Sequence, residues 1–217
     1  MTACQLTLCK VWIMLYTMSS DVNDTKTRIL EASWQLLEQR HGQGVSMSDI
    51  AKAAGISRQA VYLHFASRTE LMIATTNYVD EVKGLNERLN QFKSAKTGVQ
   101  LLEACVDVWG NYIPEIYGIA KAMLMTRDTD EATAAAWNGC MSGLRDYCLE
   151  IIVALEREGI LAPEWSRNEA IEMLWTMISV NNWEQLTIEC GWSTEQYIGR
   201  MKTLLKNTFV DITKVSK

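Results

Sequence analysis

Residues 46–70 read Ser-Met-Ser-Asp-Ile-Ala-Lys-Ala-Ala-Gly-Ile-Ser-Arg-Gln-Ala-Val-Tyr-Leu-His-Phe-Ala-Ser-Arg-Thr-Glu, a pattern of two short helices joined by a glycine turn. Apolar residues at helical spacing predict a first helix over about Met47–Ala54, with Ser46 as its N-cap. Gly55 can adopt a positive φ at no steric cost, which ends this helix. A second helix is expected over Arg58–Phe65, so the segment has the layout of a helix-turn-helix.

The second of these helices has an apolar face and a polar face. Val61 and Phe65 stand four residues apart on the apolar face. Leu63 is expected beside them. The polar side chains that project elsewhere are Arg58, Gln59, Tyr62 and His64. These residue types hydrogen-bond the bases or phosphates of DNA, which favours a DNA-binding role. Small helical domains without that role can contain the same layout.

Over residues 25–78 the chain resembles the N-terminal domain of the tetracycline-repressor (TetR) family of bacterial transcription regulators. The resemblance rests on an amphipathic helix, on the segment that covers residues 45–57, and on a Tyr-x-His-Phe run followed by Ser-Arg-x-x-Leu over residues 62–71. Ser67 and Glu70 form a capping box that opens a third helix. The apolar residues of the amphipathic helix are Ile29, Leu30, Trp34, Leu36 and Leu37.

The resemblance implies which side chains meet double-stranded DNA. It implies that the bases or the groove wall are contacted by Arg58, Gln59 and Tyr62. It implies that the DNA backbone is contacted by Ser46, Ser48, Tyr62, His64 and Arg68. The family most often has Lys where this chain has Arg68, which keeps the positive charge and should keep a phosphate contact. Position 59 varies within the family, so the resemblance implies no base preference.

Composition predicts an all-α protein. The 217 residues contain only two prolines and long amphipathic stretches. We expect a helix-turn-helix DNA-binding domain over residues 24–72 and a larger helical ligand-binding and dimerisation domain over residues 73–217. Residues 1–23 are interpreted as an N-terminal arm or a start-site extension, because their apolar part is too short for a membrane span and lacks the features of a signal peptide. A cytoplasmic protein without membrane association is expected.

The charge is unevenly distributed along the chain. Residues 24–70 carry six Lys or Arg and five Asp or Glu, whereas residues 71–217 carry fourteen and twenty. The acidic excess therefore lies away from the expected DNA-binding end. Because phosphate neutralisation supplies much of the affinity for DNA, this thin positive margin predicts moderate affinity with steep salt dependence.

Capping and breaking residues divide the second domain into six expected helices. Pro114 suits the first turn of a helix, and Gly159 and Gly191 suit helix ends. The expected helices are Leu71–Phe92, Gly98–Tyr112, Pro114–Met125, Asp128–Glu158, Arg167–Cys190 and Thr194–Ile212.

The last two expected helices are apolar on more than one side. One side would pack on the chain itself and the other on a second copy, giving a four-helix dimer interface, which the resemblance also implies. Burial wholly within one chain is the alternative. The candidate interface residues are Trp183, Leu186, Met201, Leu204 and Leu205. Two-fold symmetry would separate the recognition helices by roughly 34 Å, so the operator should be an inverted repeat.

The resemblance further implies a small-molecule pocket among the middle helices. Aromatic and Met side chains often line such pockets, although the same residue types are more often core residues. The candidates are Trp109, Tyr112, Met123, Trp137, Met141, Tyr147 and Trp175. Eight tryptophans favour a flat or hydrophobic ligand. Asp107, Asp146 and Glu172 could select a cation or could lie on exposed helix faces.

Three function classes follow. The first is a homodimeric, ligand-responsive regulator, by family resemblance usually a repressor. The second is a helical interaction module with a degenerate head. The third, an enzyme, is disfavoured because the sequence has no nucleophile elbow, no phosphate-binding glycine loop and no metal-ligand spacing. Neither a cofactor nor a metal is expected. A redox or metal sensor would use Cys4, Cys9, Cys105, Cys140, Cys148 and Cys190, which contain no C-x-x-C pair.

Overall fold

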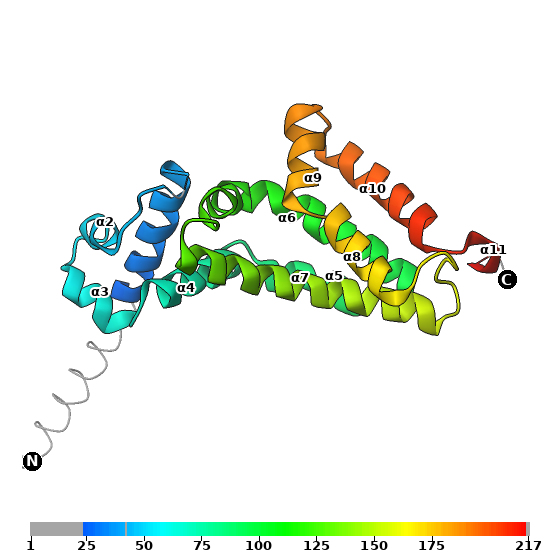
Figure 1. Cartoon of the computed structure of the whole chain (residues 1–217), viewed down its shortest axis with the longest axis horizontal. Helices are drawn as coiled ribbons and strands as arrows, with labels where there is room; N and C mark the ends of the chain where they lie inside the picture. Colours follow the sequence, from blue (N-terminus) through cyan, green and yellow to red (C-terminus); the bar gives the residue numbers. More distant parts are fainter. Residues whose placement is uncertain (1–23, 42, 216–217) are drawn as a thin grey trace, which may run out of the picture.

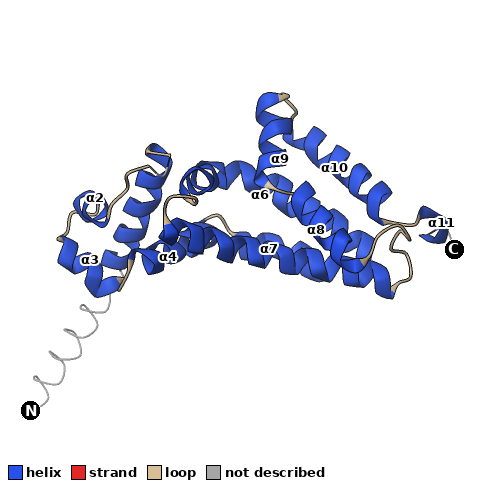
Figure 2. Cartoon of the chain, in the orientation of Figure 1, coloured by secondary structure: helices blue, strands red, loops and turns tan. Residues whose placement is uncertain are grey.

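The computed structural model describes residues 24–41 and 43–215. The described part folds into helices and connecting loops, with one isolated β-bridge between Leu161 and Val210 (Figure 2). The chain is therefore all-α, as the sequence predicts. Within the described residues, no helix is both long enough and apolar enough to cross a membrane. The interpretation of residues 1–23, including Cys4 and Cys9, lies outside the described part.

We call residues 24–72 the head and residues 73–215 the body. The head contains a first helix over residues 24–39, followed by α2 (Met47–Ala53), α3 (Arg58–His64) and the start of α4 (Arg68–Val82). The body continues with α5 (Leu85–Ser94) and the long helices α6 (Gly98–Thr126) and α7 (Glu131–Arg157). It ends with α8 (Arg167–Met177), α9 (Val180–Glu184), the π-helical turn η1 (Gln185–Glu189), α10 (Thr194–Phe209) and α11 (Ile212–Val215).

The head lies at one end of α6 and α7, which extend away from it along each other (Figure 1). In the body, α8 packs on α7, and α10 packs on α6. One large hydrophobic core joins these helices, with Leu102, Ile151 and Leu205 fully buried inside it. The body is thus a layered helical bundle that supports the head from one side.

Local sequence explains the short helices of the head. Ser46 accepts a hydrogen bond from the Asp49 backbone, and the Asp49 side chain accepts one in return, so α2 begins with a capping box. The hydrogen bonds from Ser46 stabilise the charged carboxylate of Asp49 and are the main reason why its pKa is lowered. Gly55 has a φ of 70°, which turns the chain between the two helices. Ser57 caps α3 and Ser67 caps α4.

The hydrophobic core of the head extends into the adjoining end of the body. Ile50, Val61 and Phe65 are almost completely buried, and the same cluster continues into Ile119 near the end of α6 and Trp137 near the start of α7. Burial of apolar surface is the main stabilising term in folding, so the head and this end of the body are stabilised by one shared core. A change inside the head core should therefore also affect the body.

Three expected helix boundaries are wrong. The helix expected over Leu71–Phe92 is two helices, because Gly84 has a φ of 66° and turns the chain between α4 and α5. Pro114 lies inside the continuous helix α6. Its missing N–H removes one helical hydrogen bond, but packing of both flanking halves keeps the helix continuous. The helix expected over Arg167–Cys190 is interrupted at Ser179, whose extended backbone caps α9.

Candidate DNA-binding face and ligand cavity

Helix α3 presents polar side chains on the surface of the head. Arg58, Gln59 and Tyr62 are exposed, and His64 is half-buried. The guanidinium of Arg58 lies 5.6 Å from the centre of the Tyr62 ring. Ser48 of α2 is also exposed. This face therefore offers donors from two consecutive helices to an external partner.

Most of the predicted DNA-contacting residues surround one surface hollow. The hollow has a volume of about 460 Å³ and lies where α2, α3 and α4 meet. The predicted residues that line it are Ser46, Ser48, Arg58, Tyr62 and Arg68. Gln59 and His64 do not line it. Two guanidinium groups and several hydroxyls in one hollow form a surface suited to phosphate oxygens.

Arg68 already has partners in this conformation. Its Nη2 lies 2.8 Å from Oδ2 of Asp130, and it donates to the backbone carbonyl of Val45 at 3.0 Å. Asp130 is the N-cap of α7, so this ion pair connects the head to the body. A phosphate contact from Arg68 requires the guanidinium to share or exchange its bond to Asp130.

Leu63 is not in the head core, contrary to expectation. It is 87% exposed on α3. Successive residues turn by about 100° around a helix, so a side chain two positions after buried Val61 points away from the face that Val61 and Phe65 share. The recognition helix therefore carries one large apolar side chain on its outer surface.

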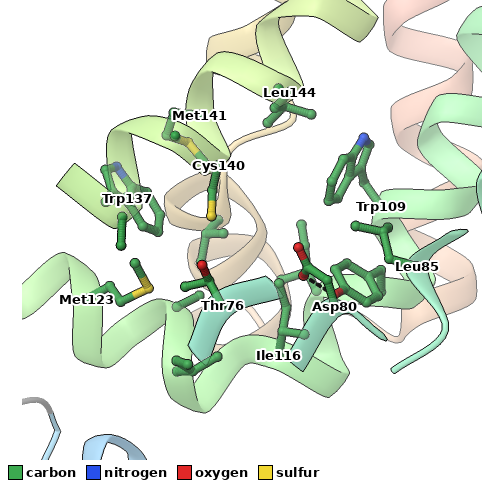
Figure 3. A pocket seen from close by; sticks show the side chains of 18 of the residues that line it. Thr76, Asp80, Leu85, Trp109, Ile116, Met123, Trp137, Cys140, Met141 and Leu144 are labelled. Atoms are coloured by element: carbon green, nitrogen blue, oxygen red, sulfur yellow. Dashed lines mark hydrogen bonds between the residues drawn. The ribbon is translucent and has the colours of Figure 1, made fainter. Parts of the chain in front are cut away.

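The body contains a cavity of about 590 Å³ between α4, α6, α7 and α8. All seven predicted ligand residues line it: Trp109, Tyr112, Met123, Trp137, Met141, Tyr147 and Trp175. Figure 3 shows Trp137 and Met123 at one end and Trp109 at the other, with Thr76 and Cys140 between them. The structure thus collects residues that are far apart in sequence around one mainly apolar space.

Asp80 is the acidic residue in the cavity lining, and it was not predicted from the sequence. It lies on α4, and one of its carboxylate oxygens accepts a hydrogen bond from the Tyr112 hydroxyl at 2.5 Å. Burial raises the pKa of Asp80, although the hydrogen bond from Tyr112 opposes this rise. A signal exists in the sequence, because the cavity-lining residues of this segment include Ile73, Thr76, Asn77 and Asp80, which share one helical face.

The acidic residues that the sequence offered for selecting a cation lie elsewhere. Asp107 pairs with Lys202 at 2.6 Å, and Glu172 pairs with Arg145 at 3.4 Å. Asp146 is exposed, and none of the three acids lines the cavity. Of the two open interpretations, the exposed helix face is the one that the structure supports.

The four described cysteines are free thiols. Cys105 and Cys148 are buried in the body core, and burial raises the pKa of both, that of Cys148 to about 12. Such thiols are protonated and unreactive near neutral pH. Cys140 lines the cavity, and Cys190 is exposed. Among the described residues, no group of three or more His, Cys, Asp or Glu side chains could hold a metal ion.

The candidate dimer residues fall into two groups. Trp183, Met201 and Leu205 are buried in the core of the single chain. Leu204 is 47% exposed and Leu186 is half-buried. The alternative of burial within one chain therefore holds for the first three residues.

A helix-turn-helix head joined to a helical body with an internal cavity defines a class of regulatory proteins rather than of enzymes. Residues 29–75 match the family model described as bacterial regulatory proteins, tetR family. The head of this chain is therefore a tetR-family DNA-binding domain by sequence. The match coincides with the first helix, α2, α3 and the first half of α4.

Individual proteins agree with the assignment. A nucleoid occlusion factor, SlmA, from Marinomonas sp. is 32% identical over 82 residues, which are 38% of this chain and 41% of that protein. The chain thus matches less than half the length of this curated relative. A putative TetR-family regulator from Rhodococcus sp. has the same fold, with a TM-score of 0.68 and 20% identity over 85% of this chain and 98% of its own.

A putative transcriptional regulator from Saccharomonospora viridis, solved in complex with choline, is similar over 87% of this chain and 98% of its own. Its TM-score is 0.68 and its identity is 15%. At this level of identity the likeness establishes the fold alone, and it covers the head and the body together.

Proposed function

We propose that this protein is a DNA-binding transcriptional regulator that acts as a homodimer on an inverted-repeat operator and responds to a small hydrophobic ligand in the body. In the repressor form of this proposal, the ligand releases the DNA. The observation that carries the proposal is the double role of α4. Leu71 of this helix is buried in the head core and Thr75 donates a hydrogen bond to Ser33 of the head, whereas Thr76 and Asp80 line the cavity.

A ligand in the cavity would therefore act directly on the helix that holds the recognition helix in place. The Arg68–Asp130 ion pair adds a second connection, because it joins the start of α4 to the start of α7. Both α4 and α7 line the cavity. If the head has two orientations that differ in the spacing of these helices, a ligand shifts their populations toward the one that it binds more tightly. The size of this shift is set by the difference between its two affinities. The choline complex of the Saccharomonospora viridis relative supports small-ligand binding in this fold.

On DNA, we assign base reading to Arg58, Gln59 and Tyr62, which α3 exposes. The hydroxyls at positions 46 and 48, together with His64 and Arg68, would contact phosphates. In the dimer, Leu186 and Leu204 would meet a second copy, while the buried residues beside them hold the helices in position. Two heads related by two-fold symmetry would read the two halves of an inverted repeat.

The test is binding of the purified full chain to a labelled duplex from the region upstream of its own gene, against a random duplex of equal length, at two salt concentrations. The proposal predicts tighter binding to the upstream duplex, and affinity for both that falls steeply as salt rises. Equal affinity for the two duplexes at both salt concentrations would contradict a specific operator in that region. Equally weak, salt-insensitive binding would instead favour the interaction module with a degenerate head.

A further inference from the structure

The cavity has one acidic side chain and one basic side chain in its lining. These are Asp80, from α4, and Arg127, which caps the end of α6. Tyr112, the hydrogen-bond partner of Asp80, lies 15 residues before Arg127 on the same helix. That separation corresponds to about 22 Å along the helix axis. The acidic and basic groups therefore occupy opposite ends of the cavity.

Arg127 already has contacts at its own end of the cavity. Its guanidinium lies 5.6 Å from the centre of the Trp137 ring, and its Nε lies 3.8 Å from Asp128. Figure 3 shows Trp137 and Asp80 on opposite sides of the drawn cavity. The charge of Arg127 thus does not compensate that of Asp80.

Asp80 has no cationic partner among the described residues. Its hydrogen bond comes from the neutral Tyr112 hydroxyl, and no ion pair joins it to a Lys, Arg or His. The nearby Arg88 pairs with Glu115, and its guanidinium lies over the Tyr112 ring; no ion pair joins it to Asp80. A carboxylate removed from water without a counter-charge is costly, so a cation that enters this end would be favoured.

Aromatic side chains surround the same end. The rings of Trp109 and Tyr112 lie 5.8 Å apart in an edge-to-face arrangement, and both line the cavity beside Asp80. Figure 3 places Trp109, Leu85 and Asp80 together around this end. Aromatic faces attract organic cations and also bury the apolar part of such a ligand. The combination of a half-buried carboxylate with aromatic rings favours a ligand that carries a positive charge on a hydrophobic body.

We propose that the cavity binds a hydrophobic organic cation, with its positive charge against Asp80 and its apolar part toward Trp137. The inference rests on the proposed ligand role of the cavity and specifies the chemical class of that ligand. A volume of about 590 Å³ is within the range of drug-sized ligand sites. Arg127 at the far end excludes a second positive charge there.

The experiment is calorimetric titration of the full chain with two phenylphosphorus probes that differ in charge: tetraphenylphosphonium, a cation, and triphenylphosphine oxide, which is neutral. The wild-type chain should bind the cation at least about tenfold more tightly than the neutral probe, since an ion pair at partial burial contributes on this scale. Asp80→Asn should abolish this preference while leaving the affinity for triphenylphosphine oxide within about twofold, because only the charge changes.

Glu81→Gln is the matched control, since Glu81 is the next residue on α4, is exposed and lies outside the cavity. It removes the same charge and should leave both affinities within about twofold. Tyr112→Phe is a second variant that keeps the carboxylate and removes its hydrogen-bond donor, and it should retain the preference for the cation. Circular dichroism melting would verify that each variant is folded.

Three results would overturn the inference: a wild-type chain that does not prefer the cation, an Asp80→Asn variant that retains the preference, or an equal loss in Glu81→Gln. The titrations contain no DNA, so their outcome is independent of the regulatory role. A chain that binds the cation through Asp80 but shows no specific DNA binding would uphold this inference and contradict the proposed function.

Discussion

The residues of the head's DNA-binding face and those of the cavity are distributed differently along the sequence. The candidate DNA-contacting residues of the head lie within 23 consecutive positions, from Ser46 to Arg68, and local caps and turns arrange them. The cavity takes its lining from helices between Ile73 and Asn181, which only the folded body brings together. Caps and turns that act locally therefore define the head, whereas the folded body is needed to show that the seven aromatic and Met candidates and Asp80 surround one space.

The shared core qualifies this contrast, because the head is not independent of the body. Phe65 is fully buried in the cluster that reaches α6 and α7. Phe65→Ala should lower the free energy of unfolding by about 3–5 kcal/mol, the usual cost of truncating a buried Phe. Chemical denaturation followed by circular dichroism measures this loss.

Leu63→Ala is the control, since Leu63 lies on the same helix and is largely exposed. It should change stability by less than about 0.5 kcal/mol. If tryptophan fluorescence from the body reported an unfolding midpoint unchanged by Phe65→Ala while the head unfolded, the shared core would not couple the two regions.

The DNA-binding face provides the second prediction. Arg58→Ala should weaken binding to the upstream duplex by about 1–3 kcal/mol and reduce the preference over random DNA, because the guanidinium is exposed at the start of the recognition helix. Fluorescence anisotropy with both duplexes measures the two affinities. Lys96→Ala, an exposed cation between α5 and α6, is the matched control and should have little effect. An equal loss on specific and random DNA would assign Arg58 to the backbone instead of the bases.

The ion pair between the two regions should have the smallest effect of these. Arg68 and Asp130 are each about one quarter exposed, with side-chain exposures of 24% and 27%. Arg68→Ala and Asp130→Asn should each cost about 1 kcal/mol in stability. Asparagine is chosen because it can still cap α7. The double variant should cost less than the sum of the two, as expected for residues in contact.

Arg145→Ala is the comparison, because its pair with Glu172 is largely exposed and should contribute less than about 0.5 kcal/mol. Denaturant titration of all four variants gives the values. Additive effects of Arg68→Ala and Asp130→Asn would show that the two groups do not stabilise each other.

Sequence reasoning succeeded where one helix determines the outcome. The boundaries of α2 and α3 differ by one residue from those expected, since Ser46, Gly55 and Ser57 act locally. The seven aromatic and Met residues were also predicted to share a pocket, and they line one cavity. The family resemblance indicated a pocket among the middle helices, and the candidates were chosen there because they are large and mainly apolar.

It failed where tertiary packing overrides a local rule. Pro114 remains inside α6 because the flanking turns are buried, and Met201 and Leu205 are covered by their own chain. Asp80 shares one helical face with Ile73, Thr76 and Asn77, but this spacing does not by itself show that the face lines a cavity. The partner of Arg68 is 62 residues away and could not be inferred from spacing.

The most direct test of the account joins the two regions in one measurement: the affinity for the upstream duplex with and without saturating tetraphenylphosphonium, in the wild-type chain and in Asp80→Asn. Calorimetry first establishes the concentration at which the wild-type cavity is occupied. The account predicts that the bound cation weakens specific DNA binding of the wild-type chain by about 5- to 150-fold, and that Asp80→Asn needs about tenfold more cation for the same loss. An unchanged DNA affinity of the wild-type chain with the cation demonstrably bound would contradict coupling between the cavity and the head.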